Sequence, residues 1–396
     1  MISFEKALNI IVKHAKKLYS IKMPVEKSAG YISAEDIYSK IVMPPFNKSA
    51  VDGYAVIAAD NKRVPLRMKS LGLIQAGENF RSKIKYGECI KIMTGAVLPK
   101  GADSVVMVED ADVHGEDVEI KTSVKKWQNV CFKGEDIQRG TKVLKKNSVI
   151  PISSVALLAT VGRSFVKVIK KPKVAVLNTG GEIVPPGEKL TKGRIYNSNG
   201  PQILSLLKSD GIDPCFLGIA KDESIELERA IKKGLPNDIF LISGGVSMGD
   251  YDLVPDILKR LGVKEIFHKV NIKPGRPLFF GTKAKTLVFG IPGNPVSNFL
   301  AYHVFIRPVI YKMSGYKYHG PVFGEGLLDK EFCQKKGRKH FVLAKVSEKD
   351  GIWHVNPIIG HGSADVLALS WANGFMVVDK DISYLNAKSR VEFIIW

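Results

Sequence analysis

Short apolar runs alternate with segments of helical spacing between residues 171 and 316. The apolar runs cover residues 174–177, 216–220, 239–242 and 287–291. Between them, apolar residues recur every three or four positions, as at Ile203, Leu204 and Leu207. Uninterrupted runs of this length are typical of parallel strands buried on both faces, and the intervening spacing is typical of amphipathic helices. The pattern therefore predicts a central three-layer α/β domain with a mostly parallel sheet.

Two of these runs end in glycine-rich turns, at the carboxyl ends of strands where open α/β sheets bind ligands. The turns are Ser243-Gly244-Gly245-Val246-Ser247-Met248-Gly249-Asp250-Tyr251-Asp252 and Pro292-Gly293-Asn294-Pro295. Asn294 is expected to be an N-cap with Pro295 as the first helical residue, and another helix is expected after Asp252. Two helix N-termini should therefore face one crevice and favour an anion there.

Acidic residues follow three of the predicted strands. Glu182, Asp222 and Asp252 lie at or just past strand ends, and right-handed crossovers would bring them to one rim of the sheet. Each acid alone is more often a helix cap, and Asp222 is expected to cap the helix that follows it. Together, their oxygens suit a hard divalent cation such as Mg²⁺.

A proline-stiffened turn at 269–277 adds positive charge between the two glycine-rich turns. It presents Lys269, Lys273 and Arg276. Cations and helix N-termini both hold anions. The simplest ligand that matches these features is a phosphorylated molecule carried with magnesium.

The regions on either side read differently from the central domain. Ser3 is expected to cap an amphipathic helix, and short strands separated by Gly, Pro and Asp turns follow to about residue 165, in one or two β-rich units. Residues 319–396 predict an all-β module with a hairpin at Lys349-Asp350-Gly351. The expected division is 1–170, 171–316 and 319–396. In the last module, Arg338 and the turn Gly360-His361-Gly362-Ser363 are polar candidates for a neighbouring site.

Composition narrows the class of protein. The 59 Lys and Arg outnumber the 39 Asp and Glu, which gives a net charge of +20, but the lysines are scattered and no nucleic-acid motif is present. An anionic small-molecule substrate explains the charge as well, so no nucleic-acid partner is expected. The four cysteines are widely spaced, which argues against a zinc site and fits a reduced compartment. No signal peptide or membrane-length apolar run is seen, so a cytoplasmic protein without a membrane partner is expected.

Common catalytic motifs do not explain the glycine-rich turns. There is no G-x-x-x-x-G-K-[ST] loop, and no G-x-G-x-x-G opens a helix of a βαβ unit. Residues 245–249 match the G-x-S-x-G pattern of a serine hydrolase. No acid and histidine follow in a convincing order, because His268 and His303 lie inside strand-like or helix-like runs. A serine hydrolase is therefore disfavoured.

Motifs along the whole chain resemble one known family. They are Pro44-Pro45-Phe46 with Ser49-Ala50-Val51-Asp52-Gly53-Tyr54-Ala55, Ile92-Met93-Thr94-Gly95-Ala96, Gly134-Glu135-Asp136, Asn178-Thr179-Gly180, Tyr196-Asn197-Ser198-Asn199-Gly200, Ser243-Gly244-Gly245-Val246-Ser247-Met248-Gly249, Lys273-Pro274-Gly275-Arg276-Pro277 and Pro292-Gly293-Asn294-Pro295-Val296-Ser297. With these motifs in this order, the chain resembles the molybdopterin molybdenumtransferases of molybdenum cofactor biosynthesis, relatives of the gephyrin E domain.

The resemblance implies both an architecture and a reaction. The implied architecture is a linker domain with an inserted β-rich subdomain, a central α/β domain like that of the molybdopterin adenylyltransferases, and a C-terminal β-barrel, in an elongated homodimer. The implied enzyme is a transferase that takes adenylylated molybdopterin and molybdate, inserts molybdenum at the dithiolene and releases AMP, with Mg²⁺. Catalysis would then be largely positioning and charge neutralisation around the departing phosphate.

Roles for individual residues are also implied by motif position. Asp222 and Asp252 would hold Mg²⁺, with Glu182 beside them. The molybdate pocket would comprise Lys273, Arg276, Pro277, Arg338 and Ser363. The catalytic set would comprise Asp52, Thr94, Asp136, Glu182 and Asp252. Further substrate contacts are expected from Thr179, Gly180, Ser243, Gly244, Gly245, Ser247, Lys269, Pro292, Gly293 and Asn294. Asp52 and Thr94 are expected to act in trans, because a long β-rich stretch separates them from the central domain.

The sequence departs from the family pattern at two places and leaves alternatives open. The family usually carries an acid and then Asn where Asn47 and Lys48 stand, and Asp or Ser where Gly181 stands, which leaves Glu182 less supported. An adenylyltransferase acting one step earlier would consume ATP. A non-catalytic scaffold would not need Asp222 and Asp252. Molybdate and tungstate are too similar for the sequence to separate.

Overall fold

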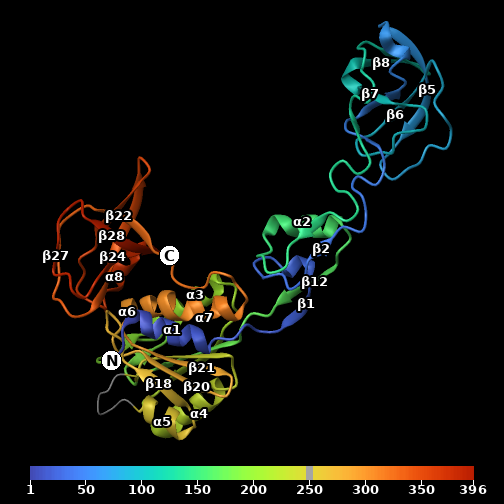
Figure 1. Ribbon diagram of the computed structural model, residues 1–396. Coiled ribbons are helices and arrows are strands. Elements are labelled where there is room, and N and C mark those ends of the chain that lie inside the picture. The colour runs from blue at the N-terminus through green and yellow to red at the C-terminus, as the bar shows by residue number, and fades with distance from the viewer. Residues whose placement is uncertain (247–252) are drawn as a thin grey trace.

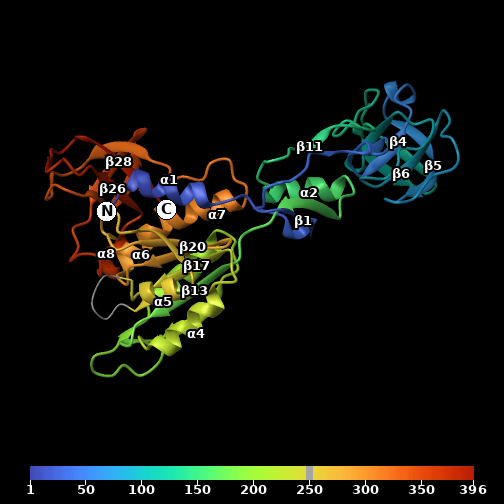
Figure 2. The same ribbon diagram turned by 60° about the horizontal axis from the view of Figure 1, so that its bottom comes forward.

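The computed structural model describes residues 1–246 and 253–396 and shows an elongated molecule. An inserted β-rich subdomain lies at one end and a narrow linker unit joins it to the rest of the chain (Figure 1). The central α/β domain and the C-terminal β-barrel lie together at the other end, in both views (Figures 1 and 2). The predicted combination of a two-part β-rich N-terminal region, an α/β domain and a barrel is confirmed.

A six-stranded sheet forms the middle layer of the central domain. Its order is β16 (Cys215–Ala220), β13 (Val174–Thr179), β17 (Ile239–Ser243), β21 (Thr286–Ile291), β20 (Phe279–Lys283) and β18 (Lys264–His268). The first four strands are parallel, and β20 runs antiparallel to both of its neighbours. Every residue of β13, β17 and β21 is buried, which explains their uninterrupted apolar sequences.

Helices cover both faces of this sheet. One face carries α3 (Asn199–Ser209), α6 (Pro295–Ala301), the π-helical turn η4 (Tyr302–Ile306), α7 (Arg307–Met313) and the N-terminal α1 (Phe4–His14). The other carries α4 (Ser224–Gly234) and α5 (Val254–Arg260). Ser3 caps α1 as predicted, since its Oγ accepts the Lys6 N–H at 3.2 Å. Helix α1 also reaches the barrel, where Glu5 pairs with Lys339 at 2.8 Å.

Five strands close into the C-terminal barrel. Their order is β24 (Lys339–Lys349), β25 (Ile352–Pro357), β22 (Gly324–Leu328), β28 (Arg390–Ile395) and β26 (Gly374–Val378), and β26 pairs back to β24. The smaller elements are β23 (Phe332–Cys333), β27 (Tyr384–Leu385) and α8 (Val366–Trp371). The predicted hairpin turn is confirmed, with positive φ at both Asp350 and Gly351. Strand β19 (Ile272–Lys273), from the central domain, pairs with β24 and so joins the central domain to the barrel.

Two separate stretches of chain build the linker unit. Its elements are β1 (Ser20–Pro24) paired with β12 (Phe165–Ile169), β2 (Ile37–Tyr38) paired with β11 (Lys142–Leu144), η1 (Val25–Lys27) and α2 (Ile152–Thr160). Between the two stretches, the chain runs out to the inserted subdomain through β3 (Lys48–Ser49) and returns through β10 (Val130–Cys131). These two strands pair with each other. The subdomain is thus inserted into the linker unit.

The inserted subdomain is a six-stranded sheet with two short 3-10 turns. Its order is β7 (Ser104–Met107), β4 (Gly53–Val56), β6 (Glu88–Ile92), β5 (Leu66–Ile74), β9 (Asp117–Ile120) and β8 (Ala111–His114), with η2 (Asp60–Lys62) and η3 (Val108–Asp110) in its loops. Apolar residues from both faces of the sheet are buried.

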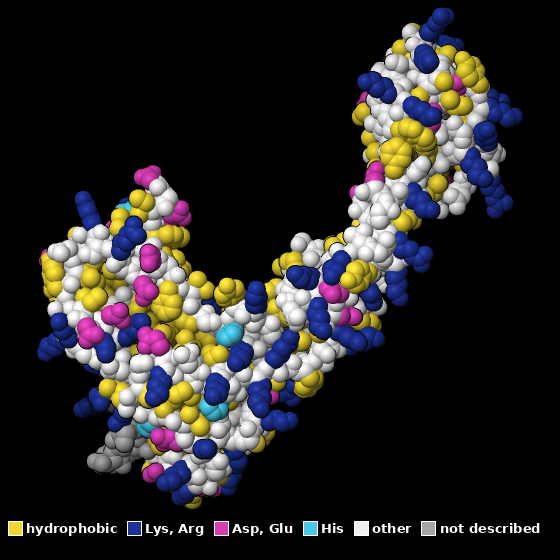
Figure 3. Space-filling model, viewed as in Figure 1, with side chains coloured by type: hydrophobic (Ala, Val, Ile, Leu, Met, Phe, Trp, Pro, Cys, Tyr) yellow, Lys and Arg dark blue, Asp and Glu magenta, His cyan; other side chains and the backbone are white. Residues whose placement is uncertain are grey.

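Charge is distributed unevenly over the molecule. Lys and Arg side chains are spread over every unit on the face in Figure 3, whereas Asp and Glu gather on the barrel. The scattering of lysines predicted from the sequence is confirmed on this face. Across the described parts of the chain, no helix is both long and apolar enough to cross a membrane.

Candidate functional site

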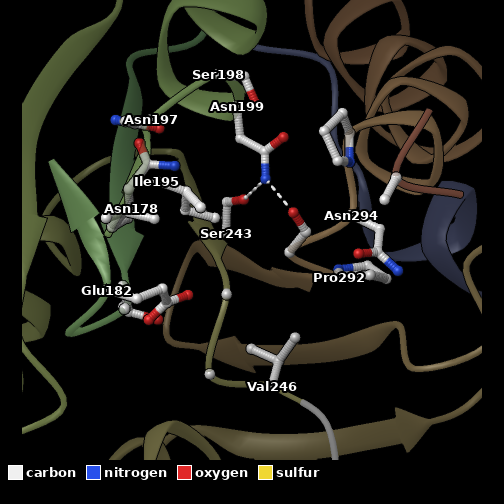
Figure 4. Close-up of a pocket in the computed structure, with 18 of the residues that line it drawn as sticks. Asn178, Glu182, Ile195, Asn197, Ser198, Asn199, Ser243, Val246, Pro292 and Asn294 are labelled. Carbon is white, nitrogen blue, oxygen red and sulfur yellow. Dashed lines mark hydrogen bonds between the residues drawn. The ribbon is translucent and has the colours of Figure 1, made fainter. Parts of the chain in front are cut away.

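A pocket of about 760 Å³ opens where β13, β17 and β21 end (Figure 4). Its lining comes from strand-end turns, from the start of α3, from α6 and from the barrel. The lining residues are Asn178, Thr179, Gly180, Glu182, Ile183, Ile195, Tyr196, Asn197, Ser198, Asn199, Asp222, Ser243, Gly244, Gly245, Val246, Pro277, Pro292, Gly293, Asn294, Pro295, Ala364 and Val366. The pocket therefore lies at the carboxyl edge of the sheet, as predicted from the apolar runs and the turns that follow them.

Ser243, the last residue of β17, forms the floor of the pocket (Figure 4). Its side-chain oxygen is 3.2 Å from Asn199 Nδ2 and 2.7 Å from Asn298 Nδ2. Asn199 Nδ2 also donates to the Gly293 carbonyl at 2.6 Å. Three segments that are distant in sequence are thus joined beneath the pocket, because one amide connects the ends of β17 and β21 to the start of α3.

Glycines keep this floor open. Gly244 and Gly245 both have positive φ, at 98° and 61°. A Cβ atom at Gly244 would lie 2.3 Å from the Thr179 carbonyl oxygen, and one at Gly245 would lie 2.8 Å from Thr179 Oγ1. The turn after β17 can therefore approach the end of β13 only because these two residues have no side chain.

The barrel supplies one wall of the pocket. Asn294 Nδ2 donates to Ser363 Oγ at 2.8 Å, and the Ser363 carbonyl accepts the Val296 N–H at 3.0 Å. The neighbouring Ala364 and Val366 line the pocket directly. Ser363 therefore reaches the central domain, as expected for a turn that contributes to a shared site.

Two of the three predicted acids, Glu182 and Asp222, line the pocket. Asp222 Oδ2 accepts the Gly181 N–H at 3.1 Å. The expectation that Asp222 caps the next helix is wrong, because α4 begins at Ser224 and the N-cap position belongs to Glu223. The third acid, Asp252, lies outside the described residues, and so does Ser247. Among the described residues, no group of three or more His, Cys, Asp or Glu side chains could hold a metal ion.

The predicted cations are not among the residues that line the pocket. Of the 269–277 turn only Pro277 is a lining residue, whereas Lys273 and Arg276 are exposed. Lys273 is paired in register with His340 of the barrel. Burial, Lys273 and Arg338 together lower the pKa of His340 to about 4. Lys273 and Arg338 therefore lie on one face, where the central domain meets the barrel.

The helix N-termini at the pocket differ from those predicted. Helix α6 begins at Pro295 next to Asn294, as expected, although the Asn294 side chain bonds Ser363 instead of capping the helix. The second N-terminus is that of α3, whose first residue, Asn199, lines the pocket. No described residue of α5, the helix that follows β17, belongs to the lining. The prediction of an N-terminus at the pocket is thus confirmed for α6, whereas the residues that lead into α5 lie outside the described part of the chain and its N-terminus stays a prediction.

Comparison with known proteins covers the whole chain. Residues 2–162 match the model of the MoeA N-terminal region (domain I and II), residues 175–312 a probable molybdopterin binding domain, and residues 325–396 the MoeA C-terminal region (domain IV). Molybdopterin molybdenumtransferases of Staphylococcus aureus and Staphylococcus epidermidis are each 32% identical over 402 residues, covering 100% of this chain and 95% of theirs. The chain belongs to the molybdopterin molybdenumtransferase family.

A solved structure supports the family assignment. A molybdopterin biosynthesis MoeA protein of Pyrococcus horikoshii is 33% identical with a TM-score of 0.78, covering 100% of this chain and 99% of that one. The resemblance inferred from the sequence motifs is therefore confirmed, as is its implication that the chain is a transferase.

The N-terminal residues expected in a molybdenumtransferase site lie away from this pocket. Asp52 precedes β4 and Thr94 follows β6, so both belong to the inserted subdomain at the far end of the molecule (Figure 1). Asp52 Oδ1 accepts from both Thr94 N and Thr94 Oγ1, each at 2.6 Å. These bonds, the hydroxyl's first, lower the pKa of the exposed Asp52 carboxyl. Asp136 is also exposed, in the connection from β10 to β11.

Several lining residues were missed as site residues. Asn178, Asn197, Ser198 and Asn199 line the pocket, and Asn197 Oδ1 accepts the Gly200 N–H at 2.9 Å. The sequence carried a signal for them, since the Asn-rich stretch 196–200 is one of the family motifs. Ala364 and Val366 had no comparable signal, because only the docking of the barrel brings them to the pocket.

Proposed function

We propose that this chain inserts molybdenum from molybdate into adenylylated molybdopterin and releases AMP. The observation that carries the proposal is the pocket itself, which lies at the sheet edge of a matched molybdopterin-binding domain and is lined by Pro277, the residue after Arg276. Relatives that carry the name molybdopterin molybdenumtransferase match the chain from end to end. A tetrahedral oxyanion is bound by cations and N–H donors and needs no base. In this proposal Lys273 and Arg276 supply the cations, and the N-terminus of α6 supplies N–H groups.

In this proposal the protein acts mainly by positioning. The pocket floor holds the organic substrate, while Lys273, Arg276, Arg338 and Ser363 hold molybdate at the junction of the central domain and the barrel. Lysine and arginine offset the charge of the oxyanion and of the phosphate that leaves with AMP. Fixing both reactants at one junction replaces a collision in water with a reaction between oriented groups.

Magnesium fits the acidic side of the pocket. Glu182 and Asp222 supply carboxylate oxygens there, and a Cβ atom at Gly180 would lie 2.9 Å from Glu182 Oε2, so this carboxylate lies directly over the turn. Mg²⁺ usually takes one or two carboxylates together with substrate phosphate oxygens. We propose that Asp222 and Asp252 hold Mg²⁺ with Glu182 beside them. When bound, the ion would neutralise phosphate charge.

We also propose that a homodimer completes the site. Asp52, Thr94 and Asp136 are expected to be functional, yet the inserted subdomain is extended away from the pocket of its own chain (Figure 1). Two-fold symmetry can bring this subdomain over the pocket of a second copy. The proposed setting is the cytoplasm, where an adenylylated intermediate and molybdate can meet.

The proposal is tested with the purified protein, adenylylated molybdopterin, molybdate and Mg²⁺. The expected result is stoichiometric release of AMP together with a product that activates a molybdenum-free apoenzyme. ATP consumption in place of AMP release from the adenylylated substrate would instead identify an adenylyltransferase. Absence of both activities would support a scaffold.

Asp222→Asn tests the magnesium assignment separately. Loss of one charge-assisted ligand should raise the Mg²⁺ concentration needed for half-maximal AMP release by about ten- to hundredfold. Asp381→Asn, an exposed acid of the barrel, is the matched control. An unchanged Mg²⁺ requirement in Asp222→Asn would place the ion elsewhere.

A further inference from the structure

The hydroxyl of Ser243 has an unusual set of partners at the floor of the pocket. Its oxygen lies within hydrogen-bond distance of two side-chain amide nitrogens, Asn199 Nδ2 at 3.2 Å and Asn298 Nδ2 at 2.7 Å. An amide nitrogen can only donate. Ser243 Oγ therefore accepts two hydrogen bonds, which uses both of its lone pairs and leaves its own proton to be donated elsewhere.

The orientation of the Asn199 amide is determined by a third group. The atom facing the Gly293 carbonyl at 2.6 Å must be a donor, because a backbone carbonyl can only accept. This places Asn199 Nδ2 toward Gly293 and Ser243, as Figure 4 shows. The same nitrogen has two protons, so it can serve both acceptors at once.

Within the described ranges, no nearby side-chain acceptor takes the Ser243 proton. Asn178 Oδ1, Thr179 Oγ1, Asn199 Oδ1 and Asn298 Oδ1 are buried and have no hydrogen-bond partner among the described residues. Ser243 is itself 2% exposed, so bulk water reaches it little. A buried hydroxyl without an acceptor is destabilising. The direction left for the proton is the pocket, which Ser243 lines.

We propose that Asn199 and Asn298 are positioning residues that hold Ser243 Oγ as an acceptor, so that the Ser243 hydroxyl donates to an acceptor oxygen of the ligand. That oxygen belongs either to the phosphate or to the ring carbonyl of the adenylylated pterin. The inference rests on the proposed function for the identity of the ligand. It also gives the contact a direction, because a donating Ser243 hydroxyl selects for an acceptor atom of the ligand and against a group that can only donate, such as a ring N–H.

Binding measurements without molybdate test this inference. Adenylylated molybdopterin, AMP and pterin-6-carboxylate are titrated into wild type, Ser243→Ala, Asn199→Ala and the double variant. We expect Ser243→Ala to weaken binding of adenylylated molybdopterin about tenfold. The same loss should appear for only one of the two fragments, AMP if the acceptor is the phosphate, or pterin-6-carboxylate if it is the ring carbonyl.

The double variant separates positioning from simple damage. If Asn199 acts through Ser243, then Asn199→Ala in the Ser243→Ala background should weaken binding less than twofold further. Independent losses that multiply would overturn the inference. Ser209→Ala on α3 and Asn386→Ala on the barrel are exposed controls of the same substitution types. Thermal unfolding shows whether each variant is folded. Ser243→Cys keeps the side-chain shape but has only a weak donor, so its binding should be weakened as in Ser243→Ala.

The outcomes also distinguish this inference from the function on which it rests. Wild type that binds none of the three compounds contradicts both. Wild type that binds adenylylated molybdopterin, with unchanged affinity in Ser243→Ala, contradicts only the inference. Full binding in Asn298→Asp, whose carboxylate would accept the Ser243 proton, would also overturn it.

Discussion

His340, in strand β24 of the barrel, is paired in register with Lys273, and the charges of Lys273 and Arg338 act on its imidazole. Its Nδ1 lies 2.9 Å from Gln334 Oε1, while Gln334 Nε2 donates to the carbonyls of Asp379 and Ile382. Because those carbonyls fix the amide, the Gln334 oxygen faces His340, and Nδ1 must carry the proton. The other nitrogen, Nε2, is then an acceptor when the ring is neutral. A neutral imidazole adds no repulsion between Lys273 and Arg338.

The lowered pKa of His340 predicts a pH dependence of stability. Unfolded His340 takes up a proton near its ordinary value of about 6.5, whereas the folded residue does so only near pH 4. The unfolded state therefore binds more protons in this window, and stability is lost as pH falls from about 6.5 to 4. His340→Gln should lose less unfolding free energy than wild type over this range, by on the order of 1 kcal/mol.

Denaturant unfolding at several pH values between 4.5 and 7.5 measures the difference. His114→Gln, on an exposed strand of the inserted subdomain, is the control substitution. Parallel pH dependences for wild type and His340→Gln would show that His340 does not contribute.

Arg276 is predicted to act on the oxyanion. Loss of one charge-assisted contact costs about 1.5 to 3 kcal/mol, roughly ten- to hundredfold in affinity. Arg276→Ala should therefore raise the molybdate concentration needed for half-maximal AMP release by this factor, with a smaller effect on binding of AMP. Arg260→Ala, on the outer helix α5, is the matched control. Equal losses for both ligands would place Arg276 on the phosphate instead.

At the scale of elements, Gly244 shapes the start of the turn after β17. Gly244 has a φ of 98° and its missing Cβ would lie 2.3 Å from the Thr179 carbonyl oxygen. Gly262, after α5, also has a positive φ, of 80°, but no atom lies within 4 Å of its missing Cβ. A side chain would cause backbone strain at both positions, but it would meet a steric clash only at Gly244.

Alanine substitution at each position should therefore give different results. Gly262→Ala should lose about 1 to 2 kcal/mol of stability from strain alone. Gly244→Ala adds a clash with backbone, so about 2 to 5 kcal/mol is expected, together with loss of adenylylated molybdopterin binding. Unfolding and binding assays on both variants check this. Normal binding by Gly244→Ala would mean that the floor can shift without harm.

At the scale of the whole molecule, the contacts between the linker unit and the central domain determine where the inserted subdomain lies. Lys171 Nζ donates to the carbonyls of Asp210 and Gly211, and Tyr316 hydroxyl donates to the Gly30 carbonyl at 2.9 Å. Lys171 lies between β12 of the linker unit and β13, so its bonds hold this connection to the end of α3, and the Tyr316 bond joins the linker unit to the central domain. The linker unit that carries the inserted subdomain therefore has defined contacts with the central domain, as a site shared between two copies would require.

A complementation experiment tests the shared site. Inactive Asp52→Ala and inactive Asp222→Ala are mixed under conditions that exchange subunits, and AMP release is assayed. If the sites are shared, each mixed dimer has one site in which both acids are intact. Random exchange should then restore about a quarter of wild-type activity. The control is each variant exchanged with itself.

Native mass spectrometry verifies that mixed dimers form. A mixture that stays inactive although mixed dimers are present would show that each site is built within one chain. A protein that remains monomeric while active would contradict the dimer itself.

The sequence by itself determined the elements and the edge of the sheet where the site lies. The apolar runs that became β13, β17 and β21 are buried on both faces, so their pattern is a direct consequence of burial. Thr179 and Ser243 end β13 and β17, and Gly293 follows β21; all three line one pocket because parallel strands end at the same edge. The sequence predicted the helix cap correctly at Ser3. It predicted the cap wrongly at Asp222, whose carboxylate accepts the Gly181 N–H from the turn after β13.

Only the tertiary structure decided which distant groups meet. The pairing of Asn199 with Ser243 and Gly293, and that of Asn294 with Ser363, join segments whose separation depends on how helices and barrel dock onto the sheet. Periodicity reports which face of an element is buried, but it carries no information about its partner in space. The position of Asp52 and Thr94 far from the pocket has the same origin, since it follows from the direction in which the linker unit leaves the central domain.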